Sequence, residues 1–206
     1  MERNLDSLRT FALSLADKLI LESVEATAQL AQIASETIHN GDKVMTCSYS
    51  STVCQILKAA RDTGKEISVI VAESRAVDGN AYGELTAREL GVLGVPVELI
   101  PDHSISQHMS LANVALIGAD TILRDGSVVN GASSLELAVA AKAVGVPFYA
   151  AAESSKLDRS GESGTKSQLE SGFEKVPFDL ITRIITEFGV WEPTELAGHT
   201  ASPKLQ

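Results

Sequence analysis

The chain has 206 residues and a net charge of −10, from 17 Lys and Arg residues against 27 Asp and Glu residues. Its length suits one domain with a sizeable core, and its 44% hydrophobic and 21% charged residues are typical of globular proteins. The acidic balance argues against direct binding of nucleic acid, which needs a basic surface. No apolar run is long enough to span a bilayer and the N-terminus lacks a signal-peptide pattern, so we expect no membrane partner and a cytoplasmic location.

Residues 1–41 are predicted to form a helical segment, either one long helix or two abutting ones. Apolar residues recur there every three or four positions, which is the spacing of one helix face. They are Leu5, Leu8, Phe11, Leu15, Leu19, Val24, Ala28, Ala31, Ala34 and Ile38. Asn40-Gly41 then provides a left-handed stop.

Short β-rich apolar runs alternate with helical patterns over residues 42–192. Strands are expected at 44–47, 67–72, 95–100, 114–117 and 146–152, and helices near 51–63, 81–92, 104–111 and 132–144. Continuous apolar strands separated by helices indicate a parallel sheet that is buried on both faces. We therefore predict an α/β fold with a parallel sheet and flanking helices, preceded by the short N-terminal helical segment.

Three later segments complete the prediction. Residues 154–172 form a long polar loop, and loops of this length are usually mobile, functional or both. The spacing of apolar residues over 178–188 predicts a further helix. Residues 193–206 contain prolines and small polar residues, and we expect them to form a frayed tail.

The residues that directly follow the strands are the candidates for a binding site, because ligands bind beyond the carboxyl ends of the strands in an open parallel sheet. These candidates are Cys47, Ser48, Ser50, Ser51, Arg75, Asp120, Asn130, Ser133, Ser134 and Lys156. Hydroxyls and backbone N–H groups at helix starts hold phosphate oxygens, and Arg75 and Lys156 supply the countercharge. The pattern predicts a phosphorylated small molecule as the ligand.

Each candidate also has a purely structural interpretation. The serines are equally well explained as helix N-caps, and Arg75 as one half of a surface ion pair. Cys47 is of a residue type that is commonly just a small buried hydrophobe. Asp120 is the hardest to explain structurally, because a carboxylate that ends an apolar strand must be paired, cap a helix or take part in chemistry.

Dinucleotide, metal and cofactor sites are not predicted. No Gly-x-Gly-x-x-Gly or Gly-Lys-Ser/Thr loop follows any strand. His103 and His108 have no evident third ligand, and Cys47 and Cys54 are too few for a metal cluster or a disulfide framework. We expect neither a metal nor a cofactor.

Several short segments, in this order along the chain, resemble one protein superfamily. They are Val44 to Ser50, Glu73-Ser74-Arg75, Asp102 before a helix, Gly118-Ala119-Asp120, Asn130, Val146 to Lys156 and Phe178 to Val190. The superfamily contains the alpha, beta and delta subunits of translation initiation factor 2B, methylthioribose-1-phosphate isomerase and archaeal ribose-1,5-bisphosphate isomerase. The resemblance covers roughly residues 15–190.

This resemblance implies a Rossmann-like α/β domain, usually preceded by a separate helical domain, and dimerisation through the α/β part. We therefore expect a homodimer or an assembly with related subunits. The isomerases of the family convert an aldose phosphate into a ketose phosphate with the cysteine of a Thr-His-Cys-Asn loop and the aspartate of Gly-Ala-Asp. The aspartate corresponds to Asp120, whereas the cysteine position falls on Ser48 and Cys47 lies one residue early.

Three readings of the function follow from this comparison, and the third is a dimeric scaffold whose pocket has decayed. The first is a regulatory protein of the initiation-factor type, which binds a sugar phosphate or a nucleotide monophosphate without turning it over. The second is a sugar-phosphate isomerase of altered mechanism, with Asp120 as acid/base and Ser48 or Cys47 as its partner. The missing cysteine, and the loss of a lysine that the family carries just after Asn130, favour the first reading. The retained Asp120 favours the second.

Overall fold

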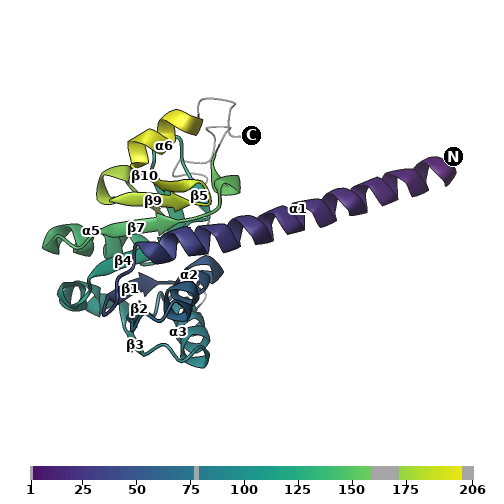
Figure 1. The fold of residues 1–206 in the computed structure, drawn as a ribbon. Coiled ribbons are helices and arrows are strands. Elements are labelled where there is room, and N and C mark those ends of the chain that lie inside the picture. The colour runs from purple at the N-terminus through teal and green to yellow at the C-terminus, as the bar shows by residue number, and fades with distance from the viewer. Residues whose placement is uncertain (1, 77–78, 159–171, 201–206) are drawn as a thin grey trace.

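The computed structural model describes residues 2–76, 79–158 and 172–200, and a seven-stranded sheet forms its centre (Figure 1). The strand order is β10-β9-β7-β4-β1-β2-β3, and all neighbours are parallel except β9 and β10. The strands are β1 (Lys43–Cys47), β2 (Ser68–Ala72), β3 (Val97–Ile100), β4 (Val114–Gly118), β7 (Phe148–Ala151), β9 (Arg183–Thr186) and β10 (Gly189–Trp191). The predicted α/β fold with a mainly parallel sheet is confirmed.

Helices cover both faces of this sheet. Helices α1 (Glu2–Glu36), α2 (Ser51–Asp62) and α3 (Tyr82–Val92) pack on one face, and α4 (Ile105–His108) and α5 (Ser134–Val144) pack on the other. Neighbouring residues of β1 enter different cores, since Val44 packs with α1 and α2 while Met45 packs with α5. Burial on both faces explains why these strands read as continuous apolar runs.

A second, three-stranded antiparallel sheet was not predicted. It consists of β5 (Thr121–Ile122), β6 (Val128–Gly131) and β8 (Phe173–Val176), in the order β5-β6-β8. The register of β6 and β8 places Asn130 opposite Glu174 and Gly131 opposite Phe173. Two segments that are distant in sequence therefore meet just beyond the main sheet.

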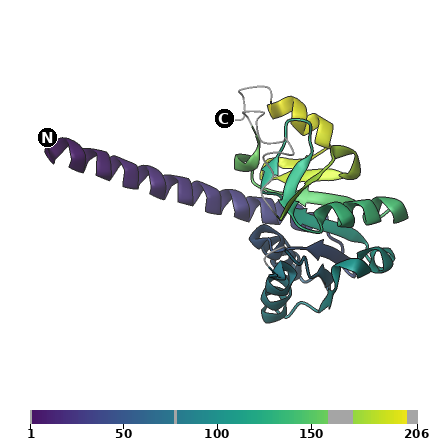
Figure 2. The same cartoon turned by 180° about the vertical axis from the view of Figure 1, so that it is seen from behind.

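Helix α1 is one continuous helix, and only its C-terminal part packs on the body of the protein (Figures 1 and 2). Leu30 and Ala34 are fully buried, whereas all residues over 6–25 are exposed. The hydroxyls of Ser23 and Thr27 donate hydrogen bonds of 2.9 and 2.5 Å to the Glu153 carboxylate, just after β7. None of the described helices, α1 included, is both long enough and apolar enough to cross a membrane.

Three predicted segments differ from the structure. The helix predicted over 178–188 is wrong, because this segment forms a short 3-10 turn (Phe178–Leu180) and strand β9. The helix expected at 104–111 is divided into α4 and two flanking 3-10 turns. The expected frayed tail begins as helix α6 (Pro193–Thr200). Most of the polar loop, residues 159–171, lies outside the described residues, and its start forms the 3-10 turn Ser154–Lys156.

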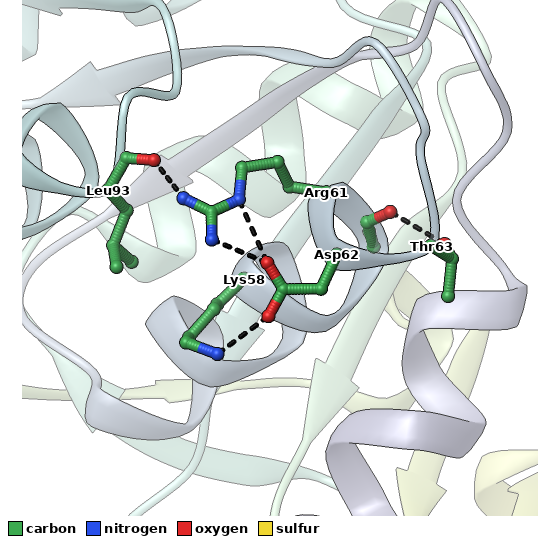
Figure 3. Close-up of polar contacts among 6 residues, drawn as sticks. Lys58, Arg61, Asp62, Thr63 and Leu93 are labelled. Atoms are coloured by element: carbon green, nitrogen blue, oxygen red, sulfur yellow. Dashed lines mark hydrogen bonds and ion pairs between the residues drawn. The ribbon is translucent and has the colours of Figure 1, made fainter.

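The C-terminal end of α2 is tied to the end of α3 by polar contacts (Figure 3). The Arg61 guanidinium donates to the backbone carbonyl of Leu93, and its Nε donates to Asp62 at 3.0 Å. Lys58 adds a 2.6 Å hydrogen bond to the same carboxylate, and these bonds, with Lys58 first, hold the pKa of Asp62 below its ordinary value. The bond from Arg61 to Leu93 links α2 to the end of α3, whereas the bonds to Asp62 lie within α2.

Candidate functional site

A pocket lies at the point where the chain reverses its direction across the sheet. From β1 the chain proceeds outward to β2 and β3, then returns to β4 on the other side of β1. Crevices for ligands form at the carboxyl ends of such neighbouring strands. The pocket here has a volume of about 560 Å³, and its lining includes Ser48, Asp120 and Asn130. Three of the predicted site residues are therefore brought together.

Aromatic side chains line the same pocket. Tyr49, Tyr82 and Phe173 are 44%, 37% and 37% exposed. The Tyr49 hydroxyl donates to Glu89 on α3 at 3.1 Å, and this hydrogen bond is the main reason why the pKa of Tyr49 is raised. The rings give the pocket apolar walls beside its polar floor, which suits a ligand with both kinds of surface.

Ser48 is held in an uncommon backbone conformation at the end of β1. Its φ angle of 59° lies in the left-handed region, which residues other than glycine rarely adopt. Its N–H donates to the Ser74 hydroxyl at 2.6 Å, and its carbonyl accepts a 2.8 Å hydrogen bond from Thr86. A Cβ atom at Gly131 would lie 2.5 Å from Ser48 Oγ, so only glycine allows this close approach.

Asp102 joins three turns around the pocket. Its Oδ1 accepts hydrogen bonds from the Ser74 N–H at 2.7 Å and from the Ser133 hydroxyl at 3.0 Å, and its Oδ2 accepts from the Arg75 N–H at 2.9 Å. Ser74 and Ser133 also have positive φ angles, of 49° and 71°. Such strained residues cluster at sites where a fixed geometry is needed. The bonds to Asp102 therefore hold the pocket walls in place.

Asp120 follows β4 and is exposed at the pocket. Its N–H donates to Val129 on β6 at 2.8 Å, which fixes its backbone. Partial burial raises the pKa of its carboxyl, and the Lys156 cation opposes this shift. A partly buried carboxyl group at a pocket can act as a general acid or base.

Cys47 does not line the pocket. Its side chain is 2% exposed, and its Sγ lies 3.5 Å from the Ser134 hydroxyl. Burial raises the pKa of this thiol to about 12, so it stays protonated at neutral pH. This position argues against a catalytic role for Cys47. Cys54 is also buried, and its pKa is raised to about 12, again by burial first.

The starts of α2 and α5 differ in how well they suit an anion. Ser50 caps α2 by accepting from the Val53 N–H at 3.3 Å, and no acidic side chain lies in the first turn of that helix. At the start of α5, Glu174 already accepts from the Leu135 N–H at 2.9 Å, close to the bond between Ser133 and Asp102. The helix dipole therefore favours a phosphate at α2, beside the exposed Ser51.

The remaining predicted residues have protein partners. Ser134 donates to the Gly131 carbonyl at 2.7 Å and accepts from the Asn130 amide at 2.8 Å. Arg75 forms an ion pair of 3.1 Å with Glu73 and donates to the Gly79 carbonyl at 3.2 Å, while its side chain stays 52% exposed. Lys156 is exposed and near Asp120.

Metal ligands do not gather at the site. Within the described ranges, no three His, Cys, Asp or Glu side chains are grouped closely enough to hold an ion. His108 Nδ1 lies 2.9 Å from the Ser104 carbonyl on its own helical turn, which accounts for this ring without a metal.

Sequence reasoning missed several residues of the pocket. Asp102 and Ser74 were recognised as parts of motifs, but their contacts with Ser133 and Ser48 depend on the sheet order. Phe173 reaches the pocket only through the pairing of β8 with β6. A polar residue directly after each strand was the available signal, and it found Ser48 and Asp120.

Comparison with known proteins agrees with the fold. The chain matches the model of the Initiation factor 2 subunit family over residues 1–173. It is 35% identical over 181 residues to a Pyrococcus horikoshii protein named "Putative translation initiation factor eIF-2B subunit 2-like", covering 82% of this chain and 64% of that protein. It is 31% identical over 214 residues to ribose 1,5-bisphosphate isomerase of Pyrococcus furiosus, covering 92% of this chain and 65% of the enzyme.

A solved structure gives the same result. The Pyrococcus horikoshii translation initiation factor eIF-2B superimposes with a TM-score of 0.81 at 32% identity, covering 89% of this chain and 70% of that one. The protein is thus an α/β protein with a pocket at the point where the strand order of its sheet reverses. The chain belongs to the initiation factor 2 subunit family. It spans about 64% of the length of the Pyrococcus horikoshii relative.

Proposed function

We propose that this protein acts in the cytoplasm as a regulatory, non-catalytic member of its family that binds a sugar phosphate or a nucleotide monophosphate. The observation that carries the proposal is the pocket at the switch point, where Ser48, Asp120 and Asn130 meet. Ser48 occupies the position that the family's isomerases give to a cysteine, and both cysteines of this chain are buried. A serine hydroxyl is a much weaker acid than a thiol, which favours binding over turnover.

The surroundings of the pocket support a phosphorylated ligand. The start of α2 provides backbone N–H groups without a competing acidic side chain in its first turn. Arg75 and Lys156 are exposed cations near the carboxyl edge of the sheet. The aromatic rings provide an apolar wall for a sugar or a base.

A panel of sugar phosphates and nucleotide monophosphates tests this function. Each compound is added at several concentrations, the melting temperature is recorded, and every stabilising ligand is followed by NMR for conversion. A ligand that raises the melting temperature and stays unchanged supports the proposal, because binding to the folded state alone stabilises it. Conversion of an aldose phosphate to its ketose contradicts the non-catalytic part, and no stabilisation by any compound contradicts the ligand class.

Arg75→Ala is expected to weaken binding of the stabilising ligand roughly tenfold, since a charge-assisted hydrogen bond to phosphate is lost. Isothermal titration calorimetry measures the change. Arg183→Ala is the matched control, because Arg183 is a partly exposed arginine at the start of β9, where it forms an ion pair with Glu192. Equal affinities of the two variants would remove Arg75 from the site.

One observation favours a second candidate function, an aldose–ketose isomerase of altered mechanism. Asp120 is exposed in the pocket with a raised pKa, and it lies in the same pocket as Ser48. In this alternative Asp120 moves a proton between the first two carbons of the sugar, and the Ser48 hydroxyl is its partner. The NMR arm of the panel experiment separates the two functions.

A further inference from the structure

A second cavity, which we call the side groove, lies between α2 and α3. Its lining includes Cys54 on α2, Leu85 and Glu89 on α3, and Leu93 just after α3, and its volume is about 580 Å³. Cys54, Leu85 and Leu93 give the side groove apolar walls. Tyr49 is the one described residue that lines both the side groove and the pocket at the switch point.

One face of α3 passes along both cavities. Tyr82 lines the pocket, whereas Leu85 and Glu89 line the side groove. These residues follow each other at spacings of three and four positions, so they lie on the same face of the helix. They span about 10 Å of the helix axis at 1.5 Å per residue. The pocket and the side groove therefore lie end to end along α3, with Tyr49 between them.

The Tyr49 side chain is held at both ends. Its backbone directly follows Ser48, whose N–H donates to Ser74 at 2.6 Å and whose carbonyl accepts from Thr86 at 2.8 Å. The Tyr49 hydroxyl donates to the Glu89 carboxylate at 3.1 Å. A hydrogen bond to a carboxylate is stronger than one between neutral groups, so moving the ring aside is unfavourable. The ring thus forms a wall between the two cavities.

This wall restricts how far a ligand can extend. The proposed ligand has its phosphate at the start of α2 and its apolar part against the aromatic rings of the pocket. An apolar substituent that lengthens this part meets Tyr49, although the apolar walls of the side groove lie behind the ring. Without the ring the two cavities would join, and burial of the substituent in the side groove would strengthen binding.

We propose that Tyr49 is a specificity-determining residue, which closes the pocket toward the side groove and limits the ligand to a sugar phosphate or a nucleotide monophosphate without a further ring on its base. The inference rests on the proposed function, because it concerns the size of the ligand in the same pocket. Glu89 acts through Tyr49 as a positioning residue, since its carboxylate holds the hydroxyl. Loss of the ring is therefore expected to change which ligands bind, and not only how tightly.

Isothermal titration calorimetry with three phosphates of increasing length tests the wall. The probes are ribose 5-phosphate, adenosine 5′-monophosphate (AMP), and AMP with a benzyl group on its exocyclic amine. We expect the wild type to bind the benzyl compound at least about tenfold more weakly than AMP. Tyr49→Ala is expected to bind the benzyl compound at least as tightly as AMP, because the added ring is buried in the side groove. Tyr49→Phe keeps the ring but loses its bond to Glu89, so its preference should be intermediate.

Two further variants show where the added ring binds. Tyr82→Ala removes an aromatic wall of the pocket that does not line the side groove, so it should weaken all three probes alike. Leu85→Trp fills the side groove, so Tyr49→Ala/Leu85→Trp should lose its affinity for the benzyl compound and keep the AMP affinity of Tyr49→Ala. Melting curves without ligand show whether each variant is folded, which is expected for Tyr49→Ala because Tyr49 is 44% exposed.

Two results would overturn the proposal and leave the proposed function standing. One is a wild type that binds the benzyl compound as tightly as AMP. The other is a folded Tyr49→Ala that keeps the wild-type preference among the three probes. Binding of none of the probes by either protein would instead contradict the proposed ligand class, and this inference with it.

Discussion

Asp102→Ala is expected to lower the free energy of unfolding by about 3 kcal/mol, because three hydrogen bonds to a carboxylate are lost at once. The loss also releases Ser74, whose hydroxyl accepts from the Ser48 N–H. The hydrogen bond from Ser48 to Ser74 is then less well fixed, so the strained backbone of Ser48 loses part of its stabilisation. The pocket is expected to lose its fixed shape. Affinity for the stabilising ligand is expected to fall at least roughly tenfold.

Urea unfolding and calorimetry, both at a temperature where each variant is folded, measure these two effects. Asp102→Asn keeps one carbonyl oxygen that can accept from Ser74 and Ser133. Its free energy of unfolding and its ligand affinity should therefore lie between those of the wild type and those of Asp102→Ala. Asp62→Ala is the control, because it removes an aspartate that accepts hydrogen bonds from Lys58 and Arg61 at the far end of α2, away from the pocket. Its ion pairs with Lys58 and Arg61 are exposed, so their loss should change the free energy of unfolding little. Unchanged ligand affinity in folded Asp102→Ala would show that Asp102 does not shape the pocket.

Asp120→Asn is expected to lower any isomerase turnover by about 10²–10⁴-fold, which is the usual contribution of an acid/base group. Ligand affinity should change much less, because the amide has the shape of the carboxylate. The measurement is the rate of ketose formation by NMR at saturating substrate. Turnover that survives in Asp120→Asn would exclude this carboxylate from the mechanism.

The same substitution has a predicted effect on the pH dependence of stability. The pKa of Asp120 is raised in the folded state, so the stability that comes from its protonated form is present below its ordinary pKa and is lost as pH rises through the raised value. Asparagine cannot ionise, so Asp120→Asn should melt slightly higher than wild type at pH 7. The two proteins should melt alike below about pH 3, where the Asp120 carboxyl is protonated in both the folded and the unfolded protein.

Asp125→Asn is a control for which we expect the opposite change in melting temperature. Burial alone would raise the pKa of Asp125, but hydrogen bonds from Lys175 and Ser127 outweigh it and hold this pKa below its ordinary value. Its stabilising effect is present above the ordinary pKa and is lost as pH falls through the lowered value. Asp125→Asn should therefore melt lower than wild type at pH 7.

The central sheet could be predicted because its strands are buried on both faces and are separated by amphipathic helices. Segment 178–188 could not be assigned correctly, since Ile181, Ile184 and Ile185 have the spacing of a helix face as well as the density of a buried strand. The flanking Thr182 and Thr186 were a neglected signal, because β-branched residues favour strands. The pairing of β6 with β8 depends on contacts that no local pattern encodes.

Only part of the candidate site could be predicted from the sequence, for a similar reason. Residues at strand ends, such as Ser48 and Asp120, follow from the position of each strand alone. The interaction of Asp102 with Ser133, and the occupation of the α5 start by Glu174, arise from separate loops that meet in three dimensions. Sequence spacing does not encode such contacts, so it could not show that the Glu174 carboxylate already accepts a hydrogen bond at the start of α5.

The two hydrogen bonds from α1 to Glu153 have a mechanical consequence. Glu153 directly precedes the turn that carries Lys156, and Ser154 in this turn is held by its N–H bond to Glu187 at 2.8 Å. The exposed residues 6–25 of α1 thus extend over about 30 Å, and the hydrogen bonds that join this helix to Glu153 lie beside the turn. Displacement of this part of α1 would therefore act on the turn that carries Lys156, near Asp120. Conversely, a ligand that holds this turn fixed would restrain movement of α1.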